Sequence, residues 1–140
     1  MTKAETAALA TMIPEQLIEG FVRESKLYQL SDVAEANKAL ERATGFVEEI
    51  SRRGGLPSLT PLMGNSDHFI AYSAADRLAD LPEFRERALA VLDRIAEMNV
   101  GFASSRADIA RNMVRYGNPD GDPAVVEKRL AAIRARYDRG

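Results

Sequence analysis

Apolar residues recur at helical spacing along almost the whole chain, and this periodicity constrains the fold more than any other feature. Steps of four and three residues place such side chains on one face of a helix, where they can pack on neighbouring helices. No segment alternates four or more β-branched residues with polar ones, so no strand is predicted. The clearest stripes are Ala36, Leu40, Ala43, Val47 and Ile50; Phe84, Ala88, Val91, Ile95 and Met98; and Val126, Leu130, Ile133 and Tyr137.

Proline and glycine indicate where these helices begin and end. Pro14 and Pro123 suit the first turn of a helix, because proline lacks a backbone N–H that would be unpaired there. Gly54 follows two arginines, a combination typical of a helix C-terminus, and Gly-Asn-Pro-Asp-Gly at 117–121 is the strongest turn signal. We therefore predict an all-α fold of about seven helices in a single domain, residues 1–140.

The composition excludes several kinds of chemistry. The chain has no cysteine and one histidine, which removes disulfides, thiolate metal sites and most zinc sites, and it lacks glycine-rich phosphate-binding motifs. We expect no metal and no cofactor. No apolar run reaches the roughly 18 residues of a membrane-spanning helix. Lys3 is followed at once by Glu5, unlike a signal peptide, so we expect a cytoplasmic protein that does not contact membranes.

The sequence also offers no strong set of catalytic residues. Gly64-Asn65-Ser66-Asp67-His68 superficially resembles a nucleophile elbow, but no strand precedes it, so Ser66 is expected to cap a helix. Asp76 and Asp80 share a helix face, yet a two-metal site in a bundle needs two Glu-x-x-His motifs. We therefore expect a protein that is not an enzyme.

Charge is distributed unevenly along the chain. Residues 1–105 carry 11 Lys and Arg against 16 Asp and Glu, whereas residues 106–140 carry 8 against 5. The basic last third permits two interpretations: an anionic partner such as a nucleic acid, or arginines that simply end helices. An overall pI of about 5.5 argues against nucleic-acid binding, which stays an alternative.

The middle of the chain carries a repeat-like pattern. Residues 56–63 have the form Leu-Pro-x-Leu-x-Pro-Leu-Met, and residues 67–78 begin with an aspartate and continue through alanines to a leucine. Small residues at positions 71, 74 and 75 would let the second helix approach its neighbours closely. This pattern resembles a HEAT repeat, in which antiparallel helix pairs stack into a superhelix.

Further motifs in the same order extend the likeness over roughly residues 14–117. They are Leu17-Ile18-Glu19-x-Phe21-Val22, Ala36-Asn37-Lys38, Glu48-Glu49-Ile50-x-Arg52-Arg53-Gly54, Ala88-Leu89-Ala90-Val91-Leu92 and Arg115-Tyr116-Gly117. Together they resemble a bacterial family of small HEAT-like proteins of the ARM-repeat superfamily, whose function is unknown. Some members are likened to immunity proteins of toxin systems. The resemblance implies an α-α superhelix with a HEAT-like body and brings no catalytic residues.

In HEAT-like pairs the second helix lines the concave surface where partners bind. On a helical wheel, aromatic residues and an aspartate of the helix after Asp67 lie opposite its apolar face, and an aspartate and two arginines of a later helix turn outward. We expect these to form one partner-binding face with aromatic and arginine anchors. The open alternative is that the terminal helix, residues 122–139, covers the aromatic pair as core. The candidate residues are Phe69, Tyr72, Asp76, Asp108, Arg111 and Arg115.

These observations predict a non-enzymatic protein-interaction module, of which an immunity-type inhibitor is one form. The identity of the protein partner is open, and a homo-oligomer is possible. The alternative is a nucleic-acid-binding accessory protein that acts through the basic last third.

Overall fold

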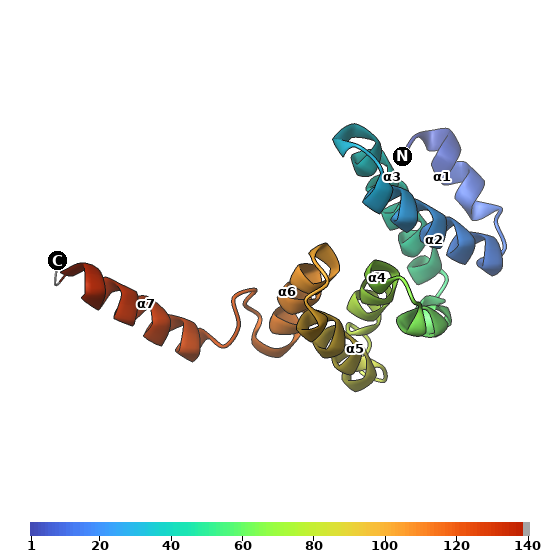
Figure 1. The fold of residues 1–140 in the computed structure, drawn as a ribbon. Helices are drawn as coiled ribbons and strands as arrows, with labels where there is room; N and C mark the ends of the chain where they lie inside the picture. Colours follow the sequence, from blue (N-terminus) through green and yellow to red (C-terminus); the bar gives the residue numbers. More distant parts are fainter. Residues whose placement is uncertain (139–140) are drawn as a thin grey trace.

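The computed structural model describes residues 1–138 and is helical throughout (Figure 1). The predicted all-α class with about seven helices is confirmed, and no strand occurs within these residues. Residue 139, the predicted end of the terminal helix, lies outside the described residues. The elements are α1 (Lys3–Ala10), α2 (Pro14–Leu30), α3 (Val33–Arg52), the 3₁₀ helix η1 (Leu56–Gly64), α4 (His68–Leu78), α5 (Arg85–Met98), α6 (Phe102–Tyr116) and α7 (Pro123–Asp138).

Local sequence signals account for the helix ends. The Asp32 carboxylate caps α3 by accepting a hydrogen bond from the backbone N–H of Glu35 at 3.0 Å. Gly117 ends α6 in the left-handed conformation, with φ of 65°. Within η1, Pro57 and Pro61 lack the N–H groups that a continuous α-helix would use, which is consistent with the short 3₁₀ form of this segment.

Most helices of the body pack chiefly on their neighbours along the chain: α2 on α3, η1 on α4, and α5 on α6. The exception is α4, which also contacts α2 and α6 and therefore lies at the centre of the body. Its small side chains allow this close packing, because alanine keeps neighbouring backbones near one another. The fully buried residues of α4 are Ile70, Ala71, Ala74, Ala75 and Leu78.

The terminal helix α7 projects away from this body (Figure 1), and none of its residues is buried. The segment between α6 and α7 has internal hydrogen bonds: the Asn112 side-chain amide donates to the Pro119 carbonyl at 3.0 Å, and Asp122 caps α7. The alternative in which the terminal helix covers Phe69 and Tyr72 is therefore wrong. None of the helices within residues 1–138 is long and apolar enough to cross a membrane.

Candidate partner-binding site

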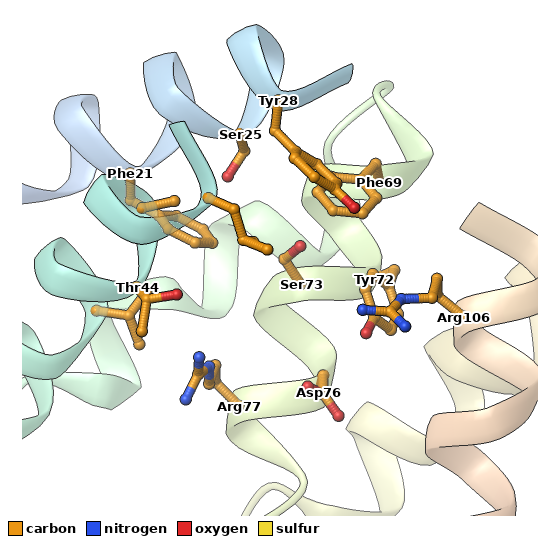
Figure 2. A pocket seen from close by; sticks show the side chains of 13 residues that line it. Phe21, Ser25, Tyr28, Thr44, Phe69, Tyr72, Ser73, Asp76, Arg77 and Arg106 are labelled. Atoms are coloured by element: carbon orange, nitrogen blue, oxygen red, sulfur yellow. The ribbon is translucent and has the colours of Figure 1, made fainter. Parts of the chain in front are cut away.

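A pocket of about 170 Å³ lies between the α2–α3 pair and α4, with one side chain of α6 at its edge (Figure 2). Phe21 and Tyr28 of α2, Val47 of α3 and Phe69 of α4 supply most of its apolar wall. Hydroxyl groups of five lining residues add hydrogen-bonding capacity. These are Ser25, Tyr28, Thr44, Tyr72 and Ser73.

Aromatic rings form a cluster at one end of this pocket. The Phe69 ring lies 5.3 Å from Tyr28, 5.6 Å from Tyr72 and 5.8 Å from Phe102, measured between ring centroids. Phe69 is consequently only 7% exposed. The expectation that Phe69 lies on an open binding face is wrong. Helix α4 has neighbours on several sides, so the face opposite its apolar core face is covered as well.

Tyr72 and Asp76 are half-buried on the side of α4 that faces the pocket (Figure 2). Arg77 follows Asp76 on α4, and Arg106 of α6 lies beside Tyr72. Burial raises the pKa of the Asp76 carboxyl above its ordinary value. Burial likewise raises the pKa of the Tyr72 hydroxyl, and the nearby Asp76 carboxylate adds to that increase.

Three charged side chains lie at the pocket. Asp76, Arg77 and Arg106 make no ion pair with any residue of the described chain. The Arg106 guanidinium instead lies 5.4 Å from the centre of the Phe102 ring. The pocket therefore combines an apolar wall with a rim of charges that have no counter-charge in contact.

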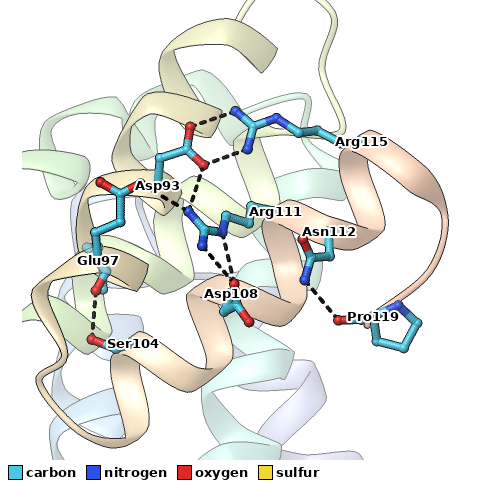
Figure 3. A network of polar contacts seen from close by, with 9 residues as sticks. Asp93, Glu97, Ser104, Asp108, Arg111, Asn112, Arg115 and Pro119 are labelled. Atoms are coloured by element: carbon cyan, nitrogen blue, oxygen red, sulfur yellow. Dashed lines mark hydrogen bonds and ion pairs between the residues drawn. The ribbon is translucent and has the colours of Figure 1, made fainter. Parts of the chain in front are cut away.

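The other three predicted site residues, Asp108, Arg111 and Arg115, lie on α6, and the two arginines bind carboxylates of α5 (Figure 3). Arg115 donates two hydrogen bonds of 2.6 Å to the Asp93 carboxylate. Arg111 bonds Asp108 at 3.0 Å and reaches Asp93 at 3.3 Å and Glu97 at 3.5 Å. The hydrogen bonds from Arg115 hold the pKa of Asp93 below its ordinary value. These residues tie α5 to α6.

The predicted face thus does not assemble as one surface. At 100° per residue, Arg111 and Arg115 lie about 140° and 180° around α6 from Arg106, the residue that approaches Tyr72. The sequence contained a signal for Arg106, since it follows Phe102 by four residues and an arginine can lie over an aromatic ring at that spacing.

The residues that the sequence offered for catalysis lie in a helix cap. Asp67, rather than Ser66, caps α4, accepting hydrogen bonds from the backbone N–H groups of Phe69 and Ile70 at 3.0 and 3.2 Å. The expectation for Ser66 is therefore wrong. Within residues 1–138, no group of three or more metal-ligating side chains is placed to hold a metal ion.

Comparison with models of known protein families gives no match. Comparisons with curated proteins and with solved structures also give no match.

Proposed function

We propose that this chain is a protein-interaction module that performs no catalysis and binds a segment of another protein at the pocket between α2, α3 and α4. One observation carries the proposal: Asp76, Arg77 and Arg106 stand unpaired within residues 1–138, around a wall of aromatic rings. Asp76 and Arg77 are half-buried, whereas Arg106 is exposed at the rim. Half-buried charges without an ion pair cost stability, and a partner that supplies the missing groups recovers that cost on binding.

The size of the pocket favours a protein side chain as its occupant. Sites for small-molecule ligands usually enclose about 300–1,000 Å³. The space here, about 170 Å³, suits one apolar or aromatic side chain. Arg77 and Arg106 would pair with a neighbouring carboxylate of the same segment, and Asp76 would accept a hydrogen bond from it.

We also propose a HEAT-like architecture for the body and an inhibitory role for the module. Packing of α2 on α3 and of α5 on α6 supports a HEAT-like arrangement of stacked helix pairs in residues 14–117. An immunity-type inhibitor, which would act by covering the active surface of a toxin, is one form that such a module takes.

The test is a selection from a library of displayed short peptides, followed by titration calorimetry. We expect enriched peptides to contain an aromatic residue beside Asp or Glu. Ser73→Phe, which fills the pocket, and Arg106→Glu should each weaken peptide binding at least about tenfold.

Arg94→Glu is the matched control, because Arg94 is exposed on α5 and makes the same charge change outside the pocket. Its affinity for the peptide should equal that of the wild type. Peptides that bind Ser73→Phe and Arg106→Glu as tightly as the wild type would contradict the proposal, as would failure to enrich any peptide.

A second candidate function is nucleic-acid binding, which is favoured by four exposed cations on the projecting helix α7. Arg111 and Arg115 do not extend this basic surface, because carboxylates of α5 and α6 already pair with them. Fluorescence anisotropy with duplex DNA and with RNA at about 50 mM salt tests this function, and absence of binding there rejects it. The four cations are Lys128, Arg129, Arg134 and Arg136.

A further inference from the structure

The terminal helix α7 carries an apolar stripe that nothing within residues 1–138 covers. Leu130, Ile133 and Tyr137 of this stripe are each at least 40% exposed, and Val126 continues it at the N-terminal end. A helix of 16 residues without tertiary contacts is only marginally stable in water. The stripe therefore needs a partner surface.

Helix α6 has an exposed apolar stripe of its own. Most of this stripe lies well around the helix from the buried residues Ala103, Ala107 and Ala110 and faces away from the body. At its N-terminal end, one face of the Phe102 ring packs on Phe69 and the rest stays exposed. The members of the stripe are between 42 and 51% exposed, which is high for side chains of this size. They are Phe102, Ile109, Met113 and Tyr116.

The apolar residues of the two stripes have the same spacing along the chain when α7 is read in the direction opposite to α6. Four residues separate Ile109 from Met113, as they separate Val126 from Leu130. Seven residues separate Phe102 from Ile109, as they separate Leu130 from Tyr137. Because every helical residue advances by the same rise, antiparallel packing brings the members face to face. The pairs are Met113 with Val126, Ile109 with Leu130, Phe102 with Tyr137, and Tyr116 with Pro123. Ile133 then faces Arg106, whose aliphatic stem it can cover.

We propose that two copies of this chain form a twofold dimer by exchanging α7, which docks antiparallel on the exposed stripe of α6 in the other copy. The linker between α6 and α7, residues 117–122, indicates that the helix docked on α6 comes from a second copy. Hydrogen bonds from Asn112 to the Pro119 carbonyl and from Asp120 N–H to the Asn118 side chain, at 3.0 Å, order the turn after α6, and α7 leaves this turn pointing away from its own α6 (Figure 1). Exchange of an identical element through such a hinge is a common route to symmetric dimers.

Charge at the edges of the stripes supports this pairing. When two helices pack antiparallel, the flank on a given side of one apolar stripe, viewed along its own helix, lies next to the flank on the same side of the other stripe. On one flank of the α6 stripe lie Asp108 and, from the adjacent α5, Glu97, whose side chain is 73% exposed. The corresponding flank of α7 carries Arg129 and Arg136.

Pairing of α7 with a second α7 is disfavoured by the same charges. Arg129 and Arg136 lie on one flank of its stripe and Arg134 on the other, so two α7 helices would bring several guanidinium groups together. The carboxylates of Asp108 and Glu97 beside the α6 stripe complement the arginines of α7 better than a second α7 does.

Disulfide trapping tests the exchange, and the absence of native cysteine makes the background clean. Ile109→Cys and Leu130→Cys are prepared as separate variants, mixed and oxidised, and a disulfide-linked dimer is expected on non-reducing gels. Lys26→Cys mixed with Leu130→Cys is the control and should stay unlinked, because Lys26 lies on the exposed face of α2. The double variant Ile109→Cys/Leu130→Cys should also link between copies.

Light scattering on the full chain supplies the second measurement. The wild type should have twice the monomer mass, Leu130→Glu should be monomeric, and Ala135→Glu, on the opposite side of α7, should stay dimeric. Circular dichroism of each variant confirms that the body is folded. A monomeric wild type, a disulfide formed only within one chain, or a dimer that survives Leu130→Glu would each overturn the proposal.

Discussion

The Phe46 ring of α3 occupies the space that a side chain at position 20 of α2 would need. A Cβ atom on Gly20 would lie 2.3 Å from Cζ of Phe46, well inside van der Waals contact. Both residues are buried, so the ring can yield to a new side chain only by displacing its own neighbours. The packing of α2 on α3 therefore depends on glycine at this position.

Gly20→Ala should lower the free energy of unfolding by about 1–3 kcal/mol, because overpacking outweighs the helix propensity that alanine adds. Urea denaturation measures the change. Gly45→Ala is the control: its Cβ would approach only the flexible Met1 side chain, so the loss should be smaller. Gly20→Ala/Phe46→Leu should recover part of the stability, and no recovery would contradict the steric explanation.

Asp93→Asn should lower the free energy of unfolding by about 1 kcal/mol at pH 7, because it removes the carboxylate that Arg115 and Arg111 bind. The pKa of Asp93 is depressed in the folded protein, so this stabilisation is present above the unfolded pKa of about 3.9 and is lost as pH falls through the folded value.

Denaturation at a series of pH values checks both effects of Asp93→Asn. The wild type should lose stability below about pH 4 more steeply than the variant. Glu97→Gln should change little, since Glu97 reaches Arg111 only at 3.5 Å and is mostly exposed. Equal acid sensitivity of the wild type and Asp93→Asn would disprove the role of this pair.

Asp76→Asn should raise the free energy of unfolding at neutral pH, on the order of 1 kcal/mol, while weakening peptide binding at the pocket. Burial raises the pKa of Asp76, so the folded state favours the protonated form and loses stability as pH rises from below about 3.9 through the folded pKa. Thermal melts and calorimetry measure the two changes. Asp120→Asn, at an exposed position outside the pocket, should alter neither.

Glu24→Met should also stabilise the body, by about 1–3 kcal/mol, because it removes an unsatisfied buried oxygen. Glu24 is 5% exposed, and its Oε2 atom has no hydrogen-bond partner within residues 1–138. Urea denaturation measures the gain, and Glu19→Met at an exposed position of α2 is the control. A loss of stability in Glu24→Met would show that the carboxylate is needed.

The sequence predicted those parts of the fold that depend on nearby residues. Helices α2 and α7 begin at Pro14 and Pro123 as predicted, and α6 ends at Gly117, the first residue of the predicted turn. These boundaries depend on neighbours within one helical turn, so the pattern alone was sufficient. The burial of Phe69 was not predictable in this way, because Phe102 covers it from 33 positions further along the chain.

The candidate site was predicted only in part for the same reason. Tyr72 and Asp76 lie at a pocket rather than on the open face that was predicted, and the partner of Arg115 is Asp93, which is 22 residues away and on another helix. The stripe of α7 correctly indicated a helix, yet a stripe specifies that a helix face is apolar and not which surface covers it.

Because the helices of the body pack chiefly on their neighbours along the chain, folding closes only short loops. Proteins dominated by such local contacts fold within microseconds to milliseconds. The body should therefore refold in one fast phase whose rate does not depend on protein concentration. Ordering of α7 on a second copy is a bimolecular encounter, and its rate should increase in proportion to concentration.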